Sequence, residues 1–316
     1  MFKTVIKTFS NPHARISRIR YSDTTEWRLR WRARQQSTKP LVMEKILYAA
    51  NGHLLNATTV DFACYLAQLT GSGLTGLFIE EDFLELVPQL DSEHSYFKGF
   101  KEEHATANVI TDVDQSMRYF TRTCKGRNIR SDAFHKWGDP VQNIVRESRF
   151  ADLLVLGSET VFNPVYNEVP TPFVKQVLAG MECPAVIAPT LIEDIDTIVF
   201  CYDGSRSALF AMKQFTYLFP QYRDKKVVVV EVEAEQGDIV AKEKIGAWMS
   251  CYYSKVGFEV LEGEAREELF KYLLMKERTF VVTGAYGRNL LSTFFHRSTA
   301  DSLMKRIDLP LFIAHH

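Results

Sequence analysis

The residues best suited to binding an anion lie near the C-terminus, in a glycine-containing loop that follows an apolar run. The run covers residues 280–282, and Gly284-Ala285-Tyr286-Gly287 comes directly after Thr283. Nine further residues separate this loop from Arg297-Ser298-Thr299, where a helix is predicted to begin. Glycine lets backbone N–H groups approach a phosphate, and a helix N-terminus presents unpaired donors. The segment therefore predicts a phosphate site, with candidate residues Gly284, Gly287, Arg297, Ser298 and Thr299.

A second candidate is the turn Asp203-Gly204-Ser205, which follows the apolar run at residues 197–201. In doubly wound sheets, ligands bind at the carboxyl ends of the strands, near the point where the strand order reverses. We therefore expect this turn and the Gly284 loop to converge on one crevice, which makes Asp203 and Gly204 candidate binding residues. Asp203 has a second interpretation, because an Asp-Gly pair also serves simply to shape a turn.

The elements that position these residues recur twice along the chain. In each copy, apolar runs of strand length alternate with segments of helical spacing, through about five strands. Four landmarks recur in the same order, and they pair as Gly52 with Gly204, Gly138 with Gly263, Gly157 with Gly284 and Pro184 with Pro310. We predict an α/β fold of two tandem doubly wound, mostly parallel five-stranded sheets, packed as a pseudo-symmetric pair.

The repeat also sets the expected domain boundaries, at residues 43–190 and 195–316, with residues 1–42 preceding both. The stretch 1–40 carries ten Lys or Arg against two acidic residues and has no sustained periodicity. A short strand, a basic arm and an organelle-type presequence are each compatible with this composition. A disordered tail or an artefactual start is favoured, because such a composition packs poorly.

The chain resembles the universal stress protein family, in its tandem form, over roughly residues 43–316, and the signature residues lie in the second copy. The signature of that family is an aspartate after the first strand and, after the fourth, G-x-x-G, nine residues, then Gly-Ser or Gly-Thr. Asp203 and the loop from Gly284 to Gly287 match this signature in type and spacing, and Arg297 stands where the third glycine is expected. The resemblance implies a stress-response adaptor or binding protein that binds an adenine nucleotide, commonly ATP.

Two departures from that signature bear on ligand binding. Arginine at position 297 lacks the conformational freedom of glycine, but it supplies a charge-assisted contact to phosphate. Ser298 has an alternative role as a helix cap, because Ser298-Thr299-Ala300-Asp301 has the form of a capping box with Asp in place of Glu. The first copy departs further from the signature. Asn51 replaces the aspartate, and Glu159, two residues after Gly157, would place a negative charge near any phosphate. We therefore predict a nucleotide site in the second domain only.

Composition argues against several other classes of protein. The five cysteines are scattered, odd in number and without a C-x-x-C pair, which favours reduced thiols in a cytoplasmic protein, most of them core filler. No apolar run approaches the roughly 18 residues that a membrane helix needs. The net charge is −1 and the chain beyond residue 40 is acidic, so nucleic acid is not an expected partner. The histidines and carboxylates do not show metal-ligand spacing.

Two alternatives to a nucleotide-binding adaptor remain open. One is a slow ATPase or another nucleotide-dependent enzyme on the same fold, although the sequence shows no water-positioning group, no G-x-x-x-x-G-K-[ST] loop and no G-x-S-x-G elbow. A non-enzymatic protein is therefore favoured. The other alternative is a structural scaffold without a ligand. The two domains are expected to pack against each other within the chain. The other expected partners are a second copy of the chain, in a homodimer, and a further protein of unspecified kind.

Overall fold

The computed structural model describes residues 43–80, 109–110, 112–160, 162, 171–233, 239–284 and 307–315. All of these residues belong to one of the two units into which the chain divides, Leu41–His316. The predictions for residues 1–42 lie outside the described residues.

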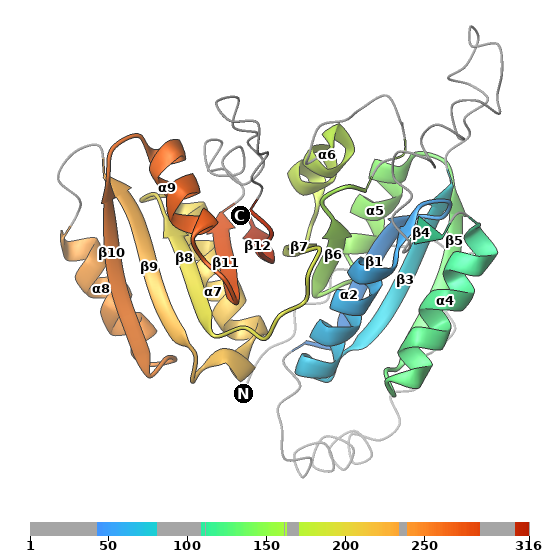
Figure 1. The fold of residues 1–316 in the computed structure, drawn as a ribbon, viewed down its shortest axis with the longest axis horizontal. Coiled ribbons are helices and arrows are strands. Elements are labelled where there is room, and N and C mark those ends of the chain that lie inside the picture. The colour runs from blue at the N-terminus through green and yellow to red at the C-terminus, as the bar shows by residue number, and fades with distance from the viewer. Residues whose placement is uncertain are drawn as a thin grey trace, which may run out of the picture. The chain divides into compact units, whose positions relative to one another are not determined.

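Ten of the described strands form one sheet, in the order β10-β9-β8-β11-β12-β7-β6-β1-β3-β5 (Figure 1). Their bounds are β1 Lys45–Asn51, β3 Gly73–Glu80, β5 Ser131–Trp137, β6 Leu153–Gly157, β7 Ala185–Ala188, β8 Thr197–Tyr202, β9 Lys226–Glu233, β10 Lys255–Glu262, β11 Thr279–Gly284 and β12 Leu311–Ala314. Every neighbouring pair in this sheet is parallel except β7 and β12. The predicted α/β class with mostly parallel strands is confirmed, and the two five-stranded sets are continuous with each other through β7 and β12.

The two sets of strands share one order. In the first set β1 lies between β3 and β6, with β5 beyond β3 and β7 beyond β6; in the second, β8, β9, β10, β11 and β12 take the corresponding places. The strand order therefore reverses between β1 and β6 and again between β8 and β11. These are the two places where a doubly wound sheet offers a ligand crevice.

Helices cover both faces of the sheet (Figure 1). Their bounds are α2 Ala57–Thr70, α4 Val113–Gly126, α5 Pro140–Ser148, α6 Pro172–Gly180, α7 Arg206–Leu218, α8 Ile239–Met249 and α9 Ala265–Leu274, with a short 3₁₀ turn at Pro220–Tyr222. Asn and Asp are residue types favoured at helix N-caps, and both occur here: Asn56 caps α2, because its Oδ1 accepts from Thr58 N at 2.9 Å. Asp139 caps α5, since its Oδ1 accepts from Gln142 N, and Pro140 takes the first helical position.

One predicted boundary is wrong. Helical spacing over residues 109–124 predicts a single helix, but Val109–Ile110 forms strand β4, which pairs antiparallel with β2, Leu55–Asn56. The helix begins at Val113 because Asp112 caps it, accepting from Gln115 N at 2.7 Å. A side-chain acceptor that satisfies the first free N–H groups sets the start of the helix more strongly than apolar periodicity does.

The core consists of two layers, one on each face of the sheet. Along β1, Ile46, Tyr48 and Ala50 pack in the layer that contains α2, α4, α7 and α8, whereas Leu47 and Ala49 pack in the layer that contains α5, α6 and α9. The continuous run Val227–Val230 divides in the same way, and each of its side chains is at most 2% exposed. Its uninterrupted apolarity is thus explained by burial on both faces, worth about 1.5–3 kcal/mol per fully buried side chain.

The two sets of strands meet where β7 pairs antiparallel with β12, with Phe312 opposite Val186. A proline precedes each of these strands, and the two prolines play the same part: Pro184 O accepts from Leu154 N, and Pro310 O accepts from Val281 N. Side chains add to the contact, since Asp308 Oδ1 accepts from Thr190 N at 2.6 Å. The domain boundaries at 190 and 195 stay a prediction.

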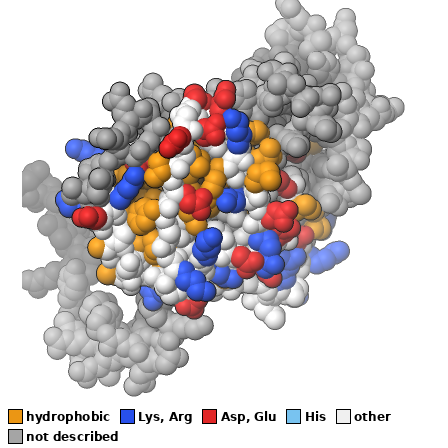
Figure 2. All heavy atoms as spheres, turned by 60° about the vertical axis from the view of Figure 1, so that its left-hand side comes forward, with side chains coloured by type: hydrophobic (Ala, Val, Ile, Leu, Met, Phe, Trp, Pro, Cys, Tyr) orange, Lys and Arg blue, Asp and Glu red, His pale blue; other side chains and the backbone are white. Residues whose placement is uncertain are grey.

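The sheet ends at β5 on one side and at β10 on the other. Figure 2 shows the side of the molecule that carries β10, where hydrophobic side chains lie among Lys, Arg, Asp and Glu. On β10 itself, Phe258 is 40% and Val260 is 43% exposed.

Candidate functional site

The two predicted parts of the site lie at the same edge of the sheet. Asp203 and Gly204 directly follow β8, and Gly284 is the last residue of β11. Strands β8 and β11 are parallel neighbours, with Phe200 opposite Val282, so their carboxyl ends lie side by side. This is the point where the strand order of the second set reverses, as the sequence predicts.

Asp203 shapes the turn after β8. Its Oδ1 accepts from Ser205 N at 3.0 Å, and Gly204 has a φ of 77°, a conformation that favours glycine. Ser205 Oγ in turn accepts from Ala208 N at 3.0 Å and caps α7. The turn-shaping interpretation of Asp203 is therefore correct, and the exposed carboxylate lies beside the N-terminus of α7.

Gly284 is needed for the contact between β11 and α7. A Cβ at this position would lie 2.6 Å from Ala208 N and from Ser207 C, both backbone atoms of the first turn of α7. The end of β11 thus lies directly against the N-terminus of a helix, where free N–H groups and the helix dipole favour an anion. The loop predicted to bind phosphate leaves the sheet at this point.

The other predicted site residues, Gly287, Arg297, Ser298 and Thr299, lie outside the described residues. Conversely, the structure adds the first turn of α7 to the candidate site, which the sequence reasoning did not include. The signal was present in the sequence, because Ser205 before an apolar-periodic segment is a typical helix N-cap.

Cys201, at the end of β8, is close to this turn but is not a candidate nucleophile. Burial raises the pKa of its thiol from 9.0 to about 12, and the negative charge of Asp203 adds to the increase. The thiol is therefore protonated at neutral pH, and the reactive thiolate form is disfavoured.

In the first set of strands, Asn51 ends β1 and makes a similar side-chain contact with a neutral group. Asn51 Oδ1 accepts from His53 N at 2.8 Å, the same two-residue spacing as between Asp203 and Ser205. Gly157 takes the place of Gly284, because a Cβ there would lie 3.1 Å from Thr59 Oγ1 in the first turn of α2. The side-chain contact and the position of the glycine recur, but Gly52 does not share the positive φ of Gly204, the contact at Gly157 is with a side chain, and Asn51 carries no charge.

A buried carboxylate lies at this edge of the first set. Glu80, the last residue of β3, is 8% exposed, and its two oxygens lie 2.6 Å from His53 Nε2 and 2.8 Å from His135 Nε2. Within the described ranges, no group of three or more His, Cys, Asp or Glu side chains is arranged to hold a metal ion. The Glu80 carboxylate is instead held between two histidines, one of which, His53, belongs to the Asn51 turn.

A search of the described helices for membrane-spanning segments found none that is both long enough and apolar enough to cross a bilayer.

No family model matches the sequence, and no curated protein matches it significantly. Solved structures do. The structure of a universal stress protein from Archaeoglobus fulgidus DSM 4304 aligns with a TM-score of 0.55 at 17% sequence identity, over 88% of this chain and 98% of that chain. A functionally unknown protein from Pseudomonas aeruginosa PAO1 aligns with a TM-score of 0.51 at 13% identity, over 87% of this chain and 93% of that one.

Identities this low establish a shared fold and leave ligands open. The alignment with the Archaeoglobus protein extends over nearly all of that chain and most of this one, so it includes both sets of strands. The resemblance inferred from Asp203 and the Gly284 loop is thus confirmed at the level of the fold: the chain has the universal stress protein fold, in its tandem form.

Proposed function

We propose that the chain is a non-enzymatic binding protein of the stress-response type, with one adenine-nucleotide site in residues 195–316. The observation that carries this proposal is the meeting of three features at one reversal of strand order. These are the exposed Asp203 carboxylate, the capped N-terminus of α7, and the end of β11 at Gly284.

Each feature suits a different part of a nucleotide. A carboxylate accepts hydrogen bonds from ribose hydroxyls or an exocyclic amine, and a helix N-terminus stabilises a phosphate. The predicted residues Gly287, Ser298 and Thr299 supply backbone and hydroxyl donors, and Arg297 adds a charge-assisted contact in place of the missing glycine.

A single site is proposed because the first set of strands lacks the exposed carboxylate. Its turn carries neutral Asn51 where the second set carries Asp203, and the carboxylate at the same edge, Glu80, is buried between His53 and His135. This difference disfavours a nucleotide there, because a side-chain amide offers one acceptor oxygen where a carboxylate offers two.

The test is isothermal titration calorimetry of the full chain with ATP, ADP and AMP. Asp203→Asn keeps the acceptor for Ser205 N, as Asn51 does in the first set, but converts the other carboxylate oxygen into a donor. We expect this change to weaken binding about tenfold or more, as for loss of one charge-assisted hydrogen bond, with the free energy of unfolding nearly unchanged.

Asn51→Asp is the matched control, because it makes the same exchange in reverse in the other turn and should leave the affinity unchanged. Absence of heat at millimolar nucleotide would leave only the ligand-free scaffold. Phosphate release from ATP that Asp203→Ala abolishes would instead support a slow ATPase. A cytoplasmic location, a homodimer and a further protein partner stay predictions.

A further inference from the structure

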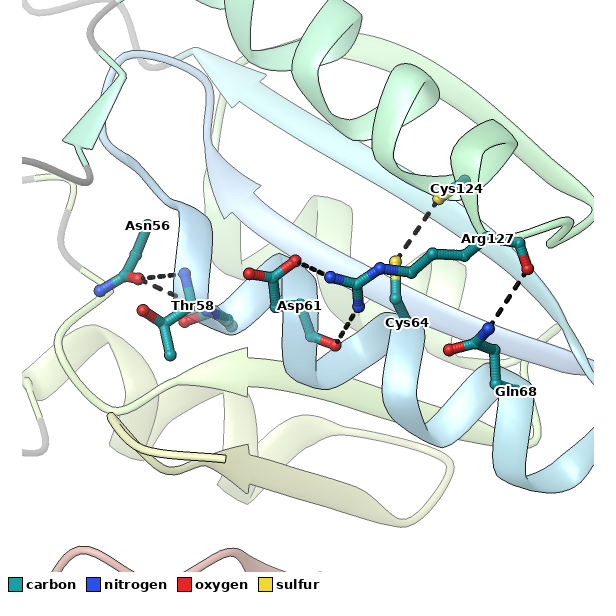
Figure 3. Close-up of polar contacts among 8 residues, drawn as sticks. Asn56, Thr58, Asp61, Cys64, Gln68, Cys124 and Arg127 are labelled. Carbon is teal, nitrogen blue, oxygen red and sulfur yellow. Dashed lines mark hydrogen bonds and ion pairs between the residues drawn. The ribbon is translucent and has the colours of Figure 1, made fainter. Parts of the chain in front are cut away.

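Two buried cysteines meet between α2 and α4, away from the candidate nucleotide site. Cys64 Sγ and Cys124 Sγ lie 3.8 Å apart, and both side chains are fully buried (Figure 3). The two sulfur atoms are in contact, and a disulfide between them requires that they approach each other by about 1.8 Å. In sequence the two residues are 60 positions apart, and nothing in their spacing signals a pair.

An ion pair holds the two helices together at the level of the sulfur atoms. Arg127, which follows α4, places Nη2 2.5 Å from Asp61 Oδ1 on α2 and donates from Nη1 to Asp61 O at 3.2 Å (Figure 3). Gln68 Nε2 donates to Arg127 O at 3.3 Å. Asp61 and Gln68 are three residues before and four residues after Cys64, so all three share one face of α2. The thiols are therefore kept in register by contacts on both sides.

The two thiols are not equivalent. The hydrogen bond between the two thiols, which either sulfur can donate, lowers the pKa of Cys124, and Ser131 and the positive charge of Arg127 lower it further against the opposing effect of burial. The same hydrogen bond and burial raise the pKa of Cys64. Cys124 is thus the sulfur that ionises first, and a thiolate is the form that attacks an oxidant.

We propose that Cys64 and Cys124 are a reversible oxidation site, which forms a disulfide between α2 and α4 when the protein meets hydrogen peroxide. The Cys124 thiolate attacks a peroxide oxygen, the O–O bond breaks, and Cys124 becomes a sulfenic acid with release of one water. The sulfur of Cys64 then attacks the sulfur of Cys124, the S–O bond breaks, and a second water leaves. The two thiols lose two electrons, which reduce one peroxide to two waters. A dithiol reductant reverses the change.

Burial limits the access of oxidants to the two thiols but does not prevent it. The side chains of Arg127 and Asp61 are 35% and 33% exposed, so the ion pair over the thiols is in contact with water. Peroxide is a small, uncharged oxidant that can enter through a local opening of the contact between α2 and α4. A bulky thiol reagent should therefore react with these cysteines far more slowly than peroxide does.

The experiment treats the reduced full chain with hydrogen peroxide, removes the excess, alkylates the unfolded protein and maps its peptides without reduction. We expect a cross-linked peptide pair containing Cys64 and Cys124, two hydrogens lighter than the two thiol peptides and absent after treatment with dithiothreitol. Cys64→Ala and Cys124→Ala, both small enough to remain packed, should each abolish it.

Cys251→Ser is the matched control, because Cys251 is exposed and lies beyond α8. The cross-link should form in this variant as in the original chain. Full alkylation of both Cys64 and Cys124 after peroxide treatment would overturn the proposal, and so would sulfinic acid at Cys124 without a cross-link. Either result would leave the pair as core filler.

Discussion

At the scale of single residues, Gly284 and Asp203 each have a structural role in the place where a ligand role is proposed. Gly284 allows β11 to contact the first turn of α7, and Asp203 orders the turn that leads into the same helix. The sequence pattern alone predicted both residues, but only coordinates reveal that backbone contact requires the glycine. Substitutions here must therefore be chosen to separate packing from binding.

Gly284→Ala should lower the free energy of unfolding by about 3 kcal/mol, because the added methyl overlaps backbone atoms that cannot move aside cheaply. Urea denaturation followed by circular dichroism measures the change. Gly126→Ala is the control, since Gly126 ends α4 and nothing lies within 4 Å of an added Cβ. It should raise stability by about 0.5 kcal/mol. Equal effects of the two changes would contradict the close approach at Gly284.

The buried thiol of Cys201 predicts a loss of stability at alkaline pH. The folded chain keeps this thiol neutral to about pH 12, whereas the unfolded chain ionises it above its ordinary pKa of 9.0. The free energy of unfolding should therefore fall as pH rises from 9 to 12, by up to about 1.4 kcal/mol per pH unit from this group. Cys201→Ala should show a correspondingly shallower decrease in urea denaturation between pH 9 and 11.

Cys251→Ala is the control, because Cys251 is exposed. In this variant the free energy of unfolding should fall with pH as steeply as in the unmodified chain. If Cys201→Ala did not change the slope, the thiol would have to ionise in the folded chain as readily as in the unfolded one.

At the scale of elements, the helix starts were the most predictable feature of the fold. Asn56, Asp139 and Thr171 cap their helices, and each is a residue type typical of N-caps that can be recognised from the residues within one turn of it. The failure at β4 has the opposite cause, since that strand depends on pairing with Leu55–Asn56, more than 50 positions earlier. Local chemistry fixes caps, and strand pairing is not local.

The cap of α2 can be tested with a rescue. Asn56→Ala removes the acceptor of Thr58 N and Thr59 N and should cost about 1 kcal/mol of stability in chemical denaturation. Asn56→Asp keeps a side-chain acceptor at the same position and should restore most of the loss. A destabilisation of the same size in both variants would mean that the hydrogen bonds of this cap contribute nothing.

At the scale of the whole molecule, the pairing of β7 with β12 joins ten of the described strands in one sheet. The sequence repeat predicted two matched sets of strands and the order of strands and helices in each. That prediction rests on apolar periodicity and on four paired landmarks. The repeat did not predict that the sets share backbone hydrogen bonds, nor that Glu80 lies between His53 and His135, because such contacts join distant segments in space.

Phe312→Ala tests whether this pairing couples the two sets. The ring is fully buried and packs edge-on against Phe215, with centroids 5.3 Å apart, so its loss should cost about 3–5 kcal/mol. Hydrogen exchange should show amides in α2 and α7 losing protection together, because one cooperative unit opens as a whole. Loss of protection in α7 alone would indicate that the two sets unfold independently, as separate domains.

The pairing of β7 with β12 also limits the strand edges through which copies of the chain could assemble. An open sheet has two edges, and two separate five-stranded sheets would have four, each able to recruit a strand from another molecule. By pairing two of those edges within one chain, the protein leaves β5 and β10 as the two ends of the ten-stranded sheet. A second copy that adds a strand to this sheet would therefore add it beside β5 or β10, because β7 and β12 already pair with each other.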